Sequence, residues 1–214
     1  MIRERAMNVR DSYDSAADAY AEHVATELAH KPLDRHLLNR FAEEVRRKGL
    51  VADLGCGPGH VAQYLHDQGV AVVGIDLSPG MVRSASSLSP ALDFRVGDMR
   101  ALDLSDAGLA GIVAFYSIVH FDPAELGTAL HECRRVLAPG GAMLLSFHVG
   151  DQTLPVNDLW GRPVSLDFRF LRPETVVAAL HSARFTVTES VEREPYEGAE
   201  YPSRRCYLFA RAAP

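Results

Sequence analysis

The chain has 214 residues, of which 47% are hydrophobic and 23% are charged, and its formal net charge is −6. This length and composition predict one substantial core in a single globular domain. A mildly acidic chain is poorly suited to a nucleic-acid backbone. The three cysteines are widely spaced and form no CxxC pair, which argues against a disulfide framework or a structural metal site.

The first residues, Met1–Met7, lack the apolar stretch of a secretion signal. No apolar run approaches the roughly 18–20 residues that a membrane-spanning helix needs. We therefore expect a cytoplasmic protein, monomer or homodimer, with no nucleic-acid or membrane partner.

Two helices are predicted before the first strand, because apolar side chains recur every three or four residues. From residue 50 onward, short apolar strands alternate with helices. This alternation predicts an α/β fold with a mostly parallel sheet and helices on both faces. The expected helices cover 11–29, 33–47, 61–68, 79–88 and 123–137, and the expected strands cover 50–54, 70–75, 91–96, 109–117 and 142–148.

The pattern loosens after Gly150. Residues 151–170, which contain the only tryptophan, Trp160, are expected to form a long polar and aromatic loop. A helix is predicted from 172 to 182. Two last strands, at 185–192 and 205–211, are expected to pair as an antiparallel hairpin at the sheet edge. Residues 139–141, Pro-Gly-Gly, are expected to form a tight turn.

A glycine-rich loop follows the first strand. Gly55, Gly57 and Gly59 stand at alternate positions between that strand and the next helix. Glycine permits close backbone approach, and a helix start offers free N–H groups to a polar ligand. The dinucleotide fingerprint needs a small residue where this chain has His60. The spacing therefore counts against an NAD-dependent oxidoreductase.

Acidic residues stand near the ends of the first three strands. They are Asp53, Asp76 and Asp98, and Asp76 follows Gly55 by 21 positions. In a doubly wound sheet these strand ends converge on one crevice, where a carboxylate can accept hydrogen bonds from a ribose diol. Each acid alone could cap a loop, but three of them behind a glycine loop favour a ribose-containing ligand.

These features together resemble the class I S-adenosylmethionine-dependent methyltransferases. The matching segments are Asp53-Leu-Gly-Cys-Gly-Pro-Gly59, Val73-Gly-Ile-Asp76, Gly97-Asp98-Met99 and Leu137-Ala-Pro-Gly-Gly141. The resemblance implies a Rossmann-like, three-layer α/β/α fold, with a seven-stranded sheet whose last strand is antiparallel. It divides the domain into an N-terminal helical lid (1–49), a cofactor-binding core (50–148) and an acceptor side (149–214).

The resemblance also implies the cofactor, S-adenosyl-L-methionine, and its contacts. The implied contacts are Asp53, Gly55, Cys56 and Gly57 for the methionine part, Asp76 for the ribose, Leu77, Met81, Asp98 and Met99 for the adenine, and Tyr116, Ser117 and the lid residue Tyr20 around the sulfonium. Cys56 needs only to be small there, and we expect no nucleophilic role for it.

Two of the nine histidines follow strands that end at the crevice. These are His120 and His148, which we expect to act as a base or to contact the acceptor, because histidine titrates near neutral pH. Tyr13 and Tyr20 on the lid are expected to contact the acceptor, or else to pack in the core. The acceptor side adds Trp160 and Arg169. Lys31 and Arg35 could meet an acidic acceptor or be solvated surface charges.

The acceptor is narrowed by two absent motifs. The segment after residue 113 lacks the Asn/Asp-Pro-Pro-aromatic signature that orients a planar amino group, and there is no Pro-Cys pair of the cytosine C5 enzymes. We therefore expect methyl transfer to an oxygen or nitrogen of a small molecule, with no metal. The alternatives are a protein or RNA acceptor, and a non-catalytic protein that binds S-adenosylmethionine.

Overall fold

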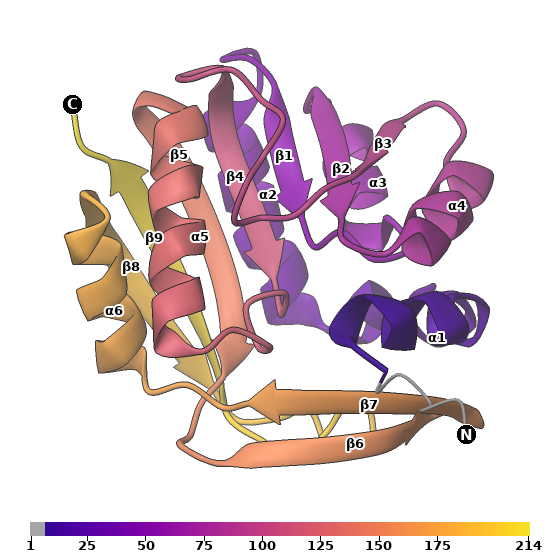
Figure 1. The fold of residues 1–214 in the computed structure, drawn as a ribbon. Coiled ribbons are helices and arrows are strands. Elements are labelled where there is room, and N and C mark those ends of the chain that lie inside the picture. The colour runs from indigo at the N-terminus through magenta and orange to yellow at the C-terminus, as the bar shows by residue number, and fades with distance from the viewer. Residues whose placement is uncertain (1–6) are drawn as a thin grey trace, which may run out of the picture.

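A seven-stranded sheet forms the centre of the fold (Figure 1). The computed structural model describes residues 7–214. The expectation about the first residues, 1–7, falls largely on residues 1–6, which lie outside the described range. The strand order is β3-β2-β1-β4-β5-β9-β8, and β9 runs antiparallel to both neighbours, as predicted. The strands are β1 (Val51–Leu54), β2 (Val72–Asp76), β3 (Asp93–Val96), β4 (Leu109–Phe115), β5 (Leu137–His148), β8 (Phe185–Arg193) and β9 (Arg205–Ala212).

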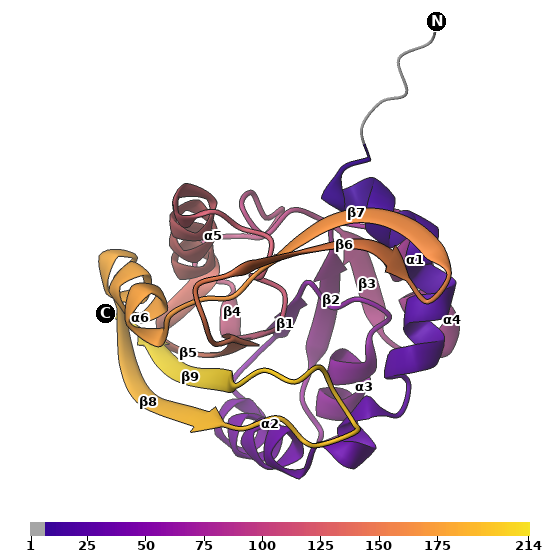
Figure 2. The same cartoon turned by 90° about the horizontal axis from the view of Figure 1, so that it is seen from below.

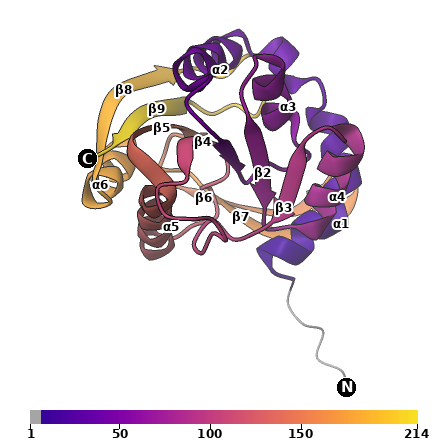
Figure 3. The same ribbon diagram turned by 90° about the horizontal axis from the view of Figure 1, so that it is seen from above.

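Helices cover both faces of the sheet, with α2 and α3 on one side and α5 and α6 on the other (Figures 2 and 3). Leu37 and Phe41 of α2 pack with Leu144 of β5, whereas Leu130 of α5 and Leu180 of α6 belong to the cluster on the opposite face. Burial on both faces explains why the central strands are continuously apolar. The helices are α2 (Pro32–Val45), α3 (His60–Asp67), α4 (Pro79–Leu88), α5 (Pro123–Val136) and α6 (Pro173–Ser182).

A further layer lies across the carboxyl ends of the parallel strands (Figure 1). It consists of α1 (Val9–Val24), the short 3-10 helix η1 (Glu27–His30), and an antiparallel hairpin of β6 (Thr153–Leu159) and β7 (Arg162–Arg169). Ala16 of α1 packs against Val164 and Leu166 of β7. This layer closes over the edge of the sheet where the glycine loop lies.

The hairpin corrects the expectation of a loop at 151–170. Trp160 and Gly161 join the two strands with φ values of 52° and 79°. Two successive positive φ values match the two-residue hairpin turn that suits the twist of paired strands. The alternation of Val164, Leu166 and Phe168 gives one apolar face, which α1 covers. Alternating apolar residues predict a strand, but the polar composition of the segment led to the expectation of a loop.

Two smaller expectations also differ. The helix expected at 11–29 ends at Val24 and resumes as η1, and the tight turn at 139–141 lies inside β5. The register of the β4–β5 pairing shifts between Leu109 and Gly111. Residues 138–141 of β5 lie opposite this shift and pair irregularly. Among residues 7–214, none of the helices is long and apolar enough to cross a membrane.

Candidate functional site

The glycine loop lies at the topological switch of the sheet. β1 pairs with β2 on one side and β4 on the other, so the segments that leave β1 and β4 meet at this point. Gly55 has φ +68°, and a Cβ added there would lie 2.3 Å from the Cβ of Ser117. Tyr116, also at positive φ (53°), precedes this contact. A residue with a Cβ therefore does not fit at position 55 unless the loop or Ser117 moves.

Asp76 holds the loop in place. Its Oδ2 accepts a hydrogen bond from the Gly57 N–H at 2.8 Å, and its Oδ1 accepts one from the Ser78 N–H at 2.8 Å. Burial raises the pKa of Asp76, and these two bonds oppose that rise. A carboxylate has about four lone-pair sites, so two acceptor positions are left for a ligand.

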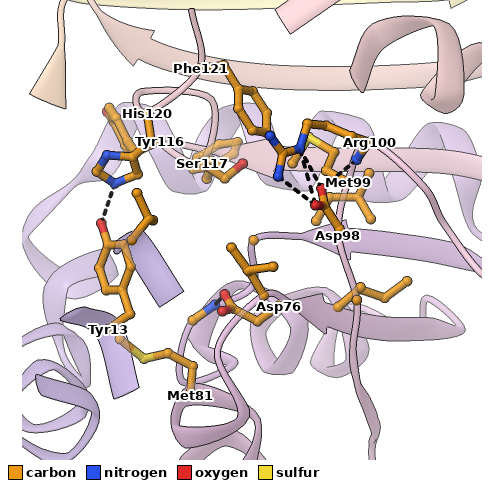
Figure 4. A pocket seen from close by; sticks show the side chains of 18 of the residues that line it. Tyr13, Asp76, Met81, Asp98, Met99, Arg100, Tyr116, Ser117, His120 and Phe121 are labelled. Carbon is orange, nitrogen blue, oxygen red and sulfur yellow. Dashed lines mark hydrogen bonds and ion pairs between the residues drawn. The ribbon is translucent and has the colours of Figure 1, made fainter. Parts of the chain in front are cut away.

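These segments surround a cavity, which we name the inner cavity (Figure 4). Its walls come from α1, the glycine loop, the ends of β2 and β3, and the segment after β4. The predicted site residues that line it are Tyr13, Tyr20, Gly55, Gly57, Asp76, Leu77, Met81, Asp98, Met99, Tyr116, Ser117 and His120. The sequence thus located most of this wall.

Asp98 has a partner that the sequence analysis missed. Arg100 donates from Nε and from its terminal nitrogen to the Asp98 carboxylate, at 3.0 and 2.7 Å (Figure 4). Arg100 also donates to Glu125 on α5. The hydrogen bond from Arg100 lowers the pKa of Asp98. Arg100 itself lines the inner cavity. The position of Arg100, two residues after the acidic residue that follows β3, could have indicated this ion pair from the sequence.

Tyr13 and His120 meet at the mouth of this cavity. Tyr13 Oη lies 2.8 Å from His120 Nε2 (Figure 4). On the other side of the ring, His120 Nδ1 lies 2.9 Å from the carbonyl oxygen of Asp167. A carbonyl only accepts, so Nδ1 carries the proton and Nε2 accepts from the Tyr13 hydroxyl. Burial lowers the pKa of His120. The imidazole is therefore neutral near pH 7, with its basic nitrogen toward Tyr13.

A second, larger space adjoins the first, and we name it the outer chamber. The two share a wall made of Tyr13, Tyr20, Gly55, Gly57, Phe115 and Tyr116. The predicted residues Cys56, His148 and Trp160 line only the outer chamber. Trp160 stacks on His23 of α1, with ring centroids 4.1 Å apart, and so ties the hairpin tip to the helix.

His148 is held by the segment before β9. Its Nδ1 lies 2.7 Å from Ser203 Oγ, which also accepts from Arg205 at 3.3 Å. A hydroxyl has one hydrogen and two lone pairs, so Ser203 is able both to donate to Nδ1 and to accept from it. Burial, together with Arg205 and Lys31, lowers the pKa of His148 to about 4. Of the two predicted bases, His120 is the one whose tautomer is fixed by its hydrogen-bond partner, the Asp167 carbonyl.

Two predicted residues, Asp53 and Arg169, lie differently from expectation. Asp53 is buried and lines neither cavity; burial raises its pKa to about 7. Burial also raises the pKa of the Cys56 thiol, which agrees with the absence of a nucleophilic role. Arg169 lines neither space, although its neighbour Phe168 lines the outer chamber. Side chains alternate along a strand, so Arg169 faces away from the chamber.

Comparisons with known proteins bear on this arrangement. Residues 51–141 match the family model described as a methyltransferase domain. The chain is 29% identical, over 89% of its length and 67% of the relative, to a malonyl-[acyl-carrier protein] O-methyltransferase of Pseudescherichia vulneris. The chain belongs to the class I S-adenosylmethionine-dependent methyltransferases.

Other similarities agree with this family. The methyltransferase is 32% identical, over 52% of its length and 45% of the relative, to a demethylmenaquinone methyltransferase of Beutenbergia cavernae. Its fold matches an S-adenosylmethionine-dependent methyltransferase of Mesorhizobium loti with a TM-score of 0.62, at 19% identity, over 78% of this chain and 92% of that one. Several curated relatives are matched over less than two thirds of their own length.

The inner cavity suits the chemistry of the family's cofactor, S-adenosylmethionine. The buried Ser117 Oγ has no hydrogen-bond partner within the described residues, and Asp76 keeps free acceptor positions. Met81 supplies apolar surface for a purine ring. Polar acceptors beside an apolar wall match a ligand made of a ribose and a base.

Proposed function

We propose that this methyltransferase transfers the methyl group of S-adenosylmethionine to an oxygen or nitrogen of a small-molecule acceptor. The observation that carries the proposal is the Tyr13–His120 pair: a neutral imidazole of fixed tautomer at the mouth of a cavity bounded by the glycine loop. Bound S-adenosylmethionine supplies an electrophilic methyl on a positively charged sulfur. The protein's part is to position the acceptor, exclude water and take up a proton.

In this proposal, the inner cavity holds the nucleoside end of the cofactor. Asp76 would accept from the ribose hydroxyls, and Leu77 and Met81 would contact the adenine. Asp98 would accept from the adenine amino group, held in position by its bonds from Arg100. The methionine end would lie along Gly55–Gly57, near the wall shared with the outer chamber.

The proposed base is His120. Nδ1 is bonded to the Asp167 carbonyl, so Nε2 is the nitrogen that can accept a proton from the acceptor. Tyr13 occupies that nitrogen with its hydroxyl, and burial raises the pKa of Tyr13 well above its usual value. Tyr13 therefore stays protonated and orients the imidazole. The acceptor displaces this hydroxyl or passes its proton through it.

Several observations favour an oxygen of a small molecule. The outer chamber is walled by aromatic side chains of α1 and the hairpin, which suits a compact organic acceptor. One relative is named an O-methyltransferase. The net charge of −6 disfavours RNA as the acceptor. The three free, buried cysteines accord with our further proposal of a cytoplasmic location.

The test has two stages. Calorimetry should detect S-adenosylmethionine binding to the purified protein, and a metabolite screen with a labelled methyl should reveal methylated product. His120→Gln should bind the cofactor like wild type but turn over more slowly. Cofactor binding without transfer to any acceptor would support the non-catalytic alternative instead, and absence of binding would overturn the proposal altogether.

A further inference from the structure

The outer chamber has an ionic end. Aromatic side chains form much of its wall, but four charged side chains line it where η1 approaches the segment before β9: Glu27, Lys31, Glu200 and Arg205. Three of these charges are withdrawn from solvent, since Lys31 is 6% exposed, Arg205 is 2% exposed and the Glu200 side chain is 4% exposed. Buried charges are costly unless they are well paired. How they are paired indicates what the chamber accepts.

Lys31 is incompletely paired. Its Nζ donates to Glu27 Oε2 at 2.9 Å, whereas Glu200 Oε2 lies at 3.8 Å, beyond hydrogen-bond distance. An ammonium has three N–H donors, and one strong bond leaves two of them without a close acceptor. The same ammonium lies 5.4 Å from the ring centroid of Tyr116, the residue that lines both cavities. Lys31 thus presents donors beside the wall between the two spaces.

Both nearby carboxylates are shared with other groups. Glu27 also bonds His60 at 2.9 Å; although burial raises the pKa of Glu27, its bonds from His60 and Lys31 lower it to about 2. Glu200 is bound by Arg193 and lies 3.2 Å from Arg205 Nε. One carboxylate therefore faces three cations. Arg193 also pairs with the buried Asp34 at 3.0 Å, so the ammonium of Lys31 is the cation with donors left over at this end of the chamber.

His148 lies near these charges. Burial, followed by Arg205, Lys31 and Arg193, lowers its pKa to about 4, against the opposing effect of Glu200. A neutral imidazole has one N–H, which lies on Nε2 when Ser203 donates to Nδ1. The remaining N–H donors of Lys31 suit an anionic oxygen.

We propose that Lys31 binds a carboxylate of the methyl acceptor at the ionic end of the outer chamber, with His148 as a second donor. The acceptor is then an organic acid whose apolar or aromatic body lies between Tyr20, Trp160 and Phe168. This inference rests on the proposed function, because it names the acceptor class of the same site. The carboxylate acts as an anchor, and no bond is made or broken at it in this proposal.

An amine acceptor of the same size fits less well. A protonated amine near Lys31 and Arg205 would meet like charges, and the carboxylates that could attract it already bond to side chains of the protein. Arg35, the other cation that the sequence left open, donates to the carbonyls of Leu28 and Ala29 at 2.6 Å and does not line the chamber. Of Lys31 and Arg35, it is Lys31 that lines the outer chamber.

The test uses Trp160, the only tryptophan of the chain, as a reporter inside the chamber. The full chain is saturated with S-adenosylhomocysteine, and Trp160 fluorescence is followed during titration with 3-phenylpropionate or octanoate, and with the corresponding primary amides. Each acid should bind at least about tenfold more tightly than its amide, because only the acid offers a charged partner to Lys31.

Variants sharpen the comparison. Lys31→Met should abolish the preference for acids, and Lys31→Arg should keep most of it because the charge remains. The matched control is Arg40→Gln, which removes an exposed cation of α2 that pairs with Glu189, outside the chamber. Arg40→Gln should leave the preference unchanged.

The proposal would be overturned if the wild type bound acid and amide equally, or bound neither. It would also be overturned if the preference for acids survived in a Lys31→Met protein with an unchanged melting temperature. Failure here is distinct from failure of the proposed function. A protein that binds S-adenosylmethionine and methylates only neutral acceptors would refute the carboxylate anchor and leave methyl transfer intact.

Discussion

The hydroxyl of Tyr13 lies 2.8 Å from Nε2 of His120, and this bond joins α1 to the segment after β4. The two residues are 107 positions apart. The bond connects the layer over the sheet with the strand ends beneath it. A contact that closes the site thereby also fixes the orientation of the candidate base.

The first prediction concerns this pair. His120→Gln removes the only proposed proton acceptor at the mouth of the inner cavity, and general bases contribute about 10²–10⁴-fold to rate. We expect kcat to fall within that range, with cofactor affinity by calorimetry near wild type. Tyr13→Phe should lower kcat less, because the Asp167 carbonyl still fixes the tautomer. The control, His131→Gln on the exposed side of α5, should keep full turnover; full turnover in His120→Gln would refute the base.

The second prediction is a pH profile. Burial lowers the pKa of His120 below its ordinary 6.5, and a base acts only when deprotonated. Activity should therefore be lost on acidification, with the half-maximal point of kcat/KM below pH 6.5. The profile of His120→Gln should lack this inflection. A half-maximal point above pH 6.5 in the wild type would contradict the assignment.

The third prediction tests ribose recognition. Asp76→Ala removes an acceptor from the inner cavity and also two hydrogen bonds to the loop and to Ser78. Loss of hydrogen bonds to a charged acceptor should weaken S-adenosylmethionine binding by about 1–3 kcal/mol, measured by calorimetry. Asp103→Asn, at an exposed position, should bind normally. Unchanged affinity in Asp76→Ala would rule out a contact with the ribose.

Much of the fold follows from local patterns in the sequence. The continuous apolar strands and the glycine loop are features of neighbouring residues, so the parallel core could be predicted in order. The hairpin of β6 and β7 was missed because its stability depends on packing against α1, far away in the sequence. Tertiary contacts of this kind leave only a weak alternation in the sequence.

The residues of the candidate site also differ in how well the sequence predicts them. The acids and glycines of the inner cavity belong to contiguous motifs, which explains why the sequence located them. The outer chamber combines Glu27 and Lys31 with Glu200 and Arg205, residues that only the folded chain brings together. Nothing in their local sequence distinguishes these charges from solvated surface charges.

The fourth prediction concerns the loop geometry. Gly55→Ala places a Cβ 2.3 Å from Ser117 Cβ, whereas Gly140, at a similar φ of +73°, has open space around it. Both substitutions impose a left-handed conformation on alanine, at about 1–2 kcal/mol each. Gly55→Ala should therefore destabilise the protein more than Gly140→Ala in urea unfolding, and it alone should weaken cofactor binding. Equal costs would mean that the loop can move away from Ser117.

The last prediction concerns stability in mild acid. Burial, with Arg205 and Lys31, lowers the pKa of His148 from 6.5 to about 4 in the folded protein. Between these values the unfolded chain binds a proton that folded His148 excludes, so stability falls as the pH drops through this window. The expected loss between pH 7 and pH 5 is about 2 kcal/mol from this residue alone. His148→Phe keeps an aromatic ring beside Phe170 and should reduce the loss of unfolding free energy by that amount, measured with urea at both pH values. His131→Gln should show the wild-type loss; an equal loss in His148→Phe would mean that His148 is not held neutral by the fold.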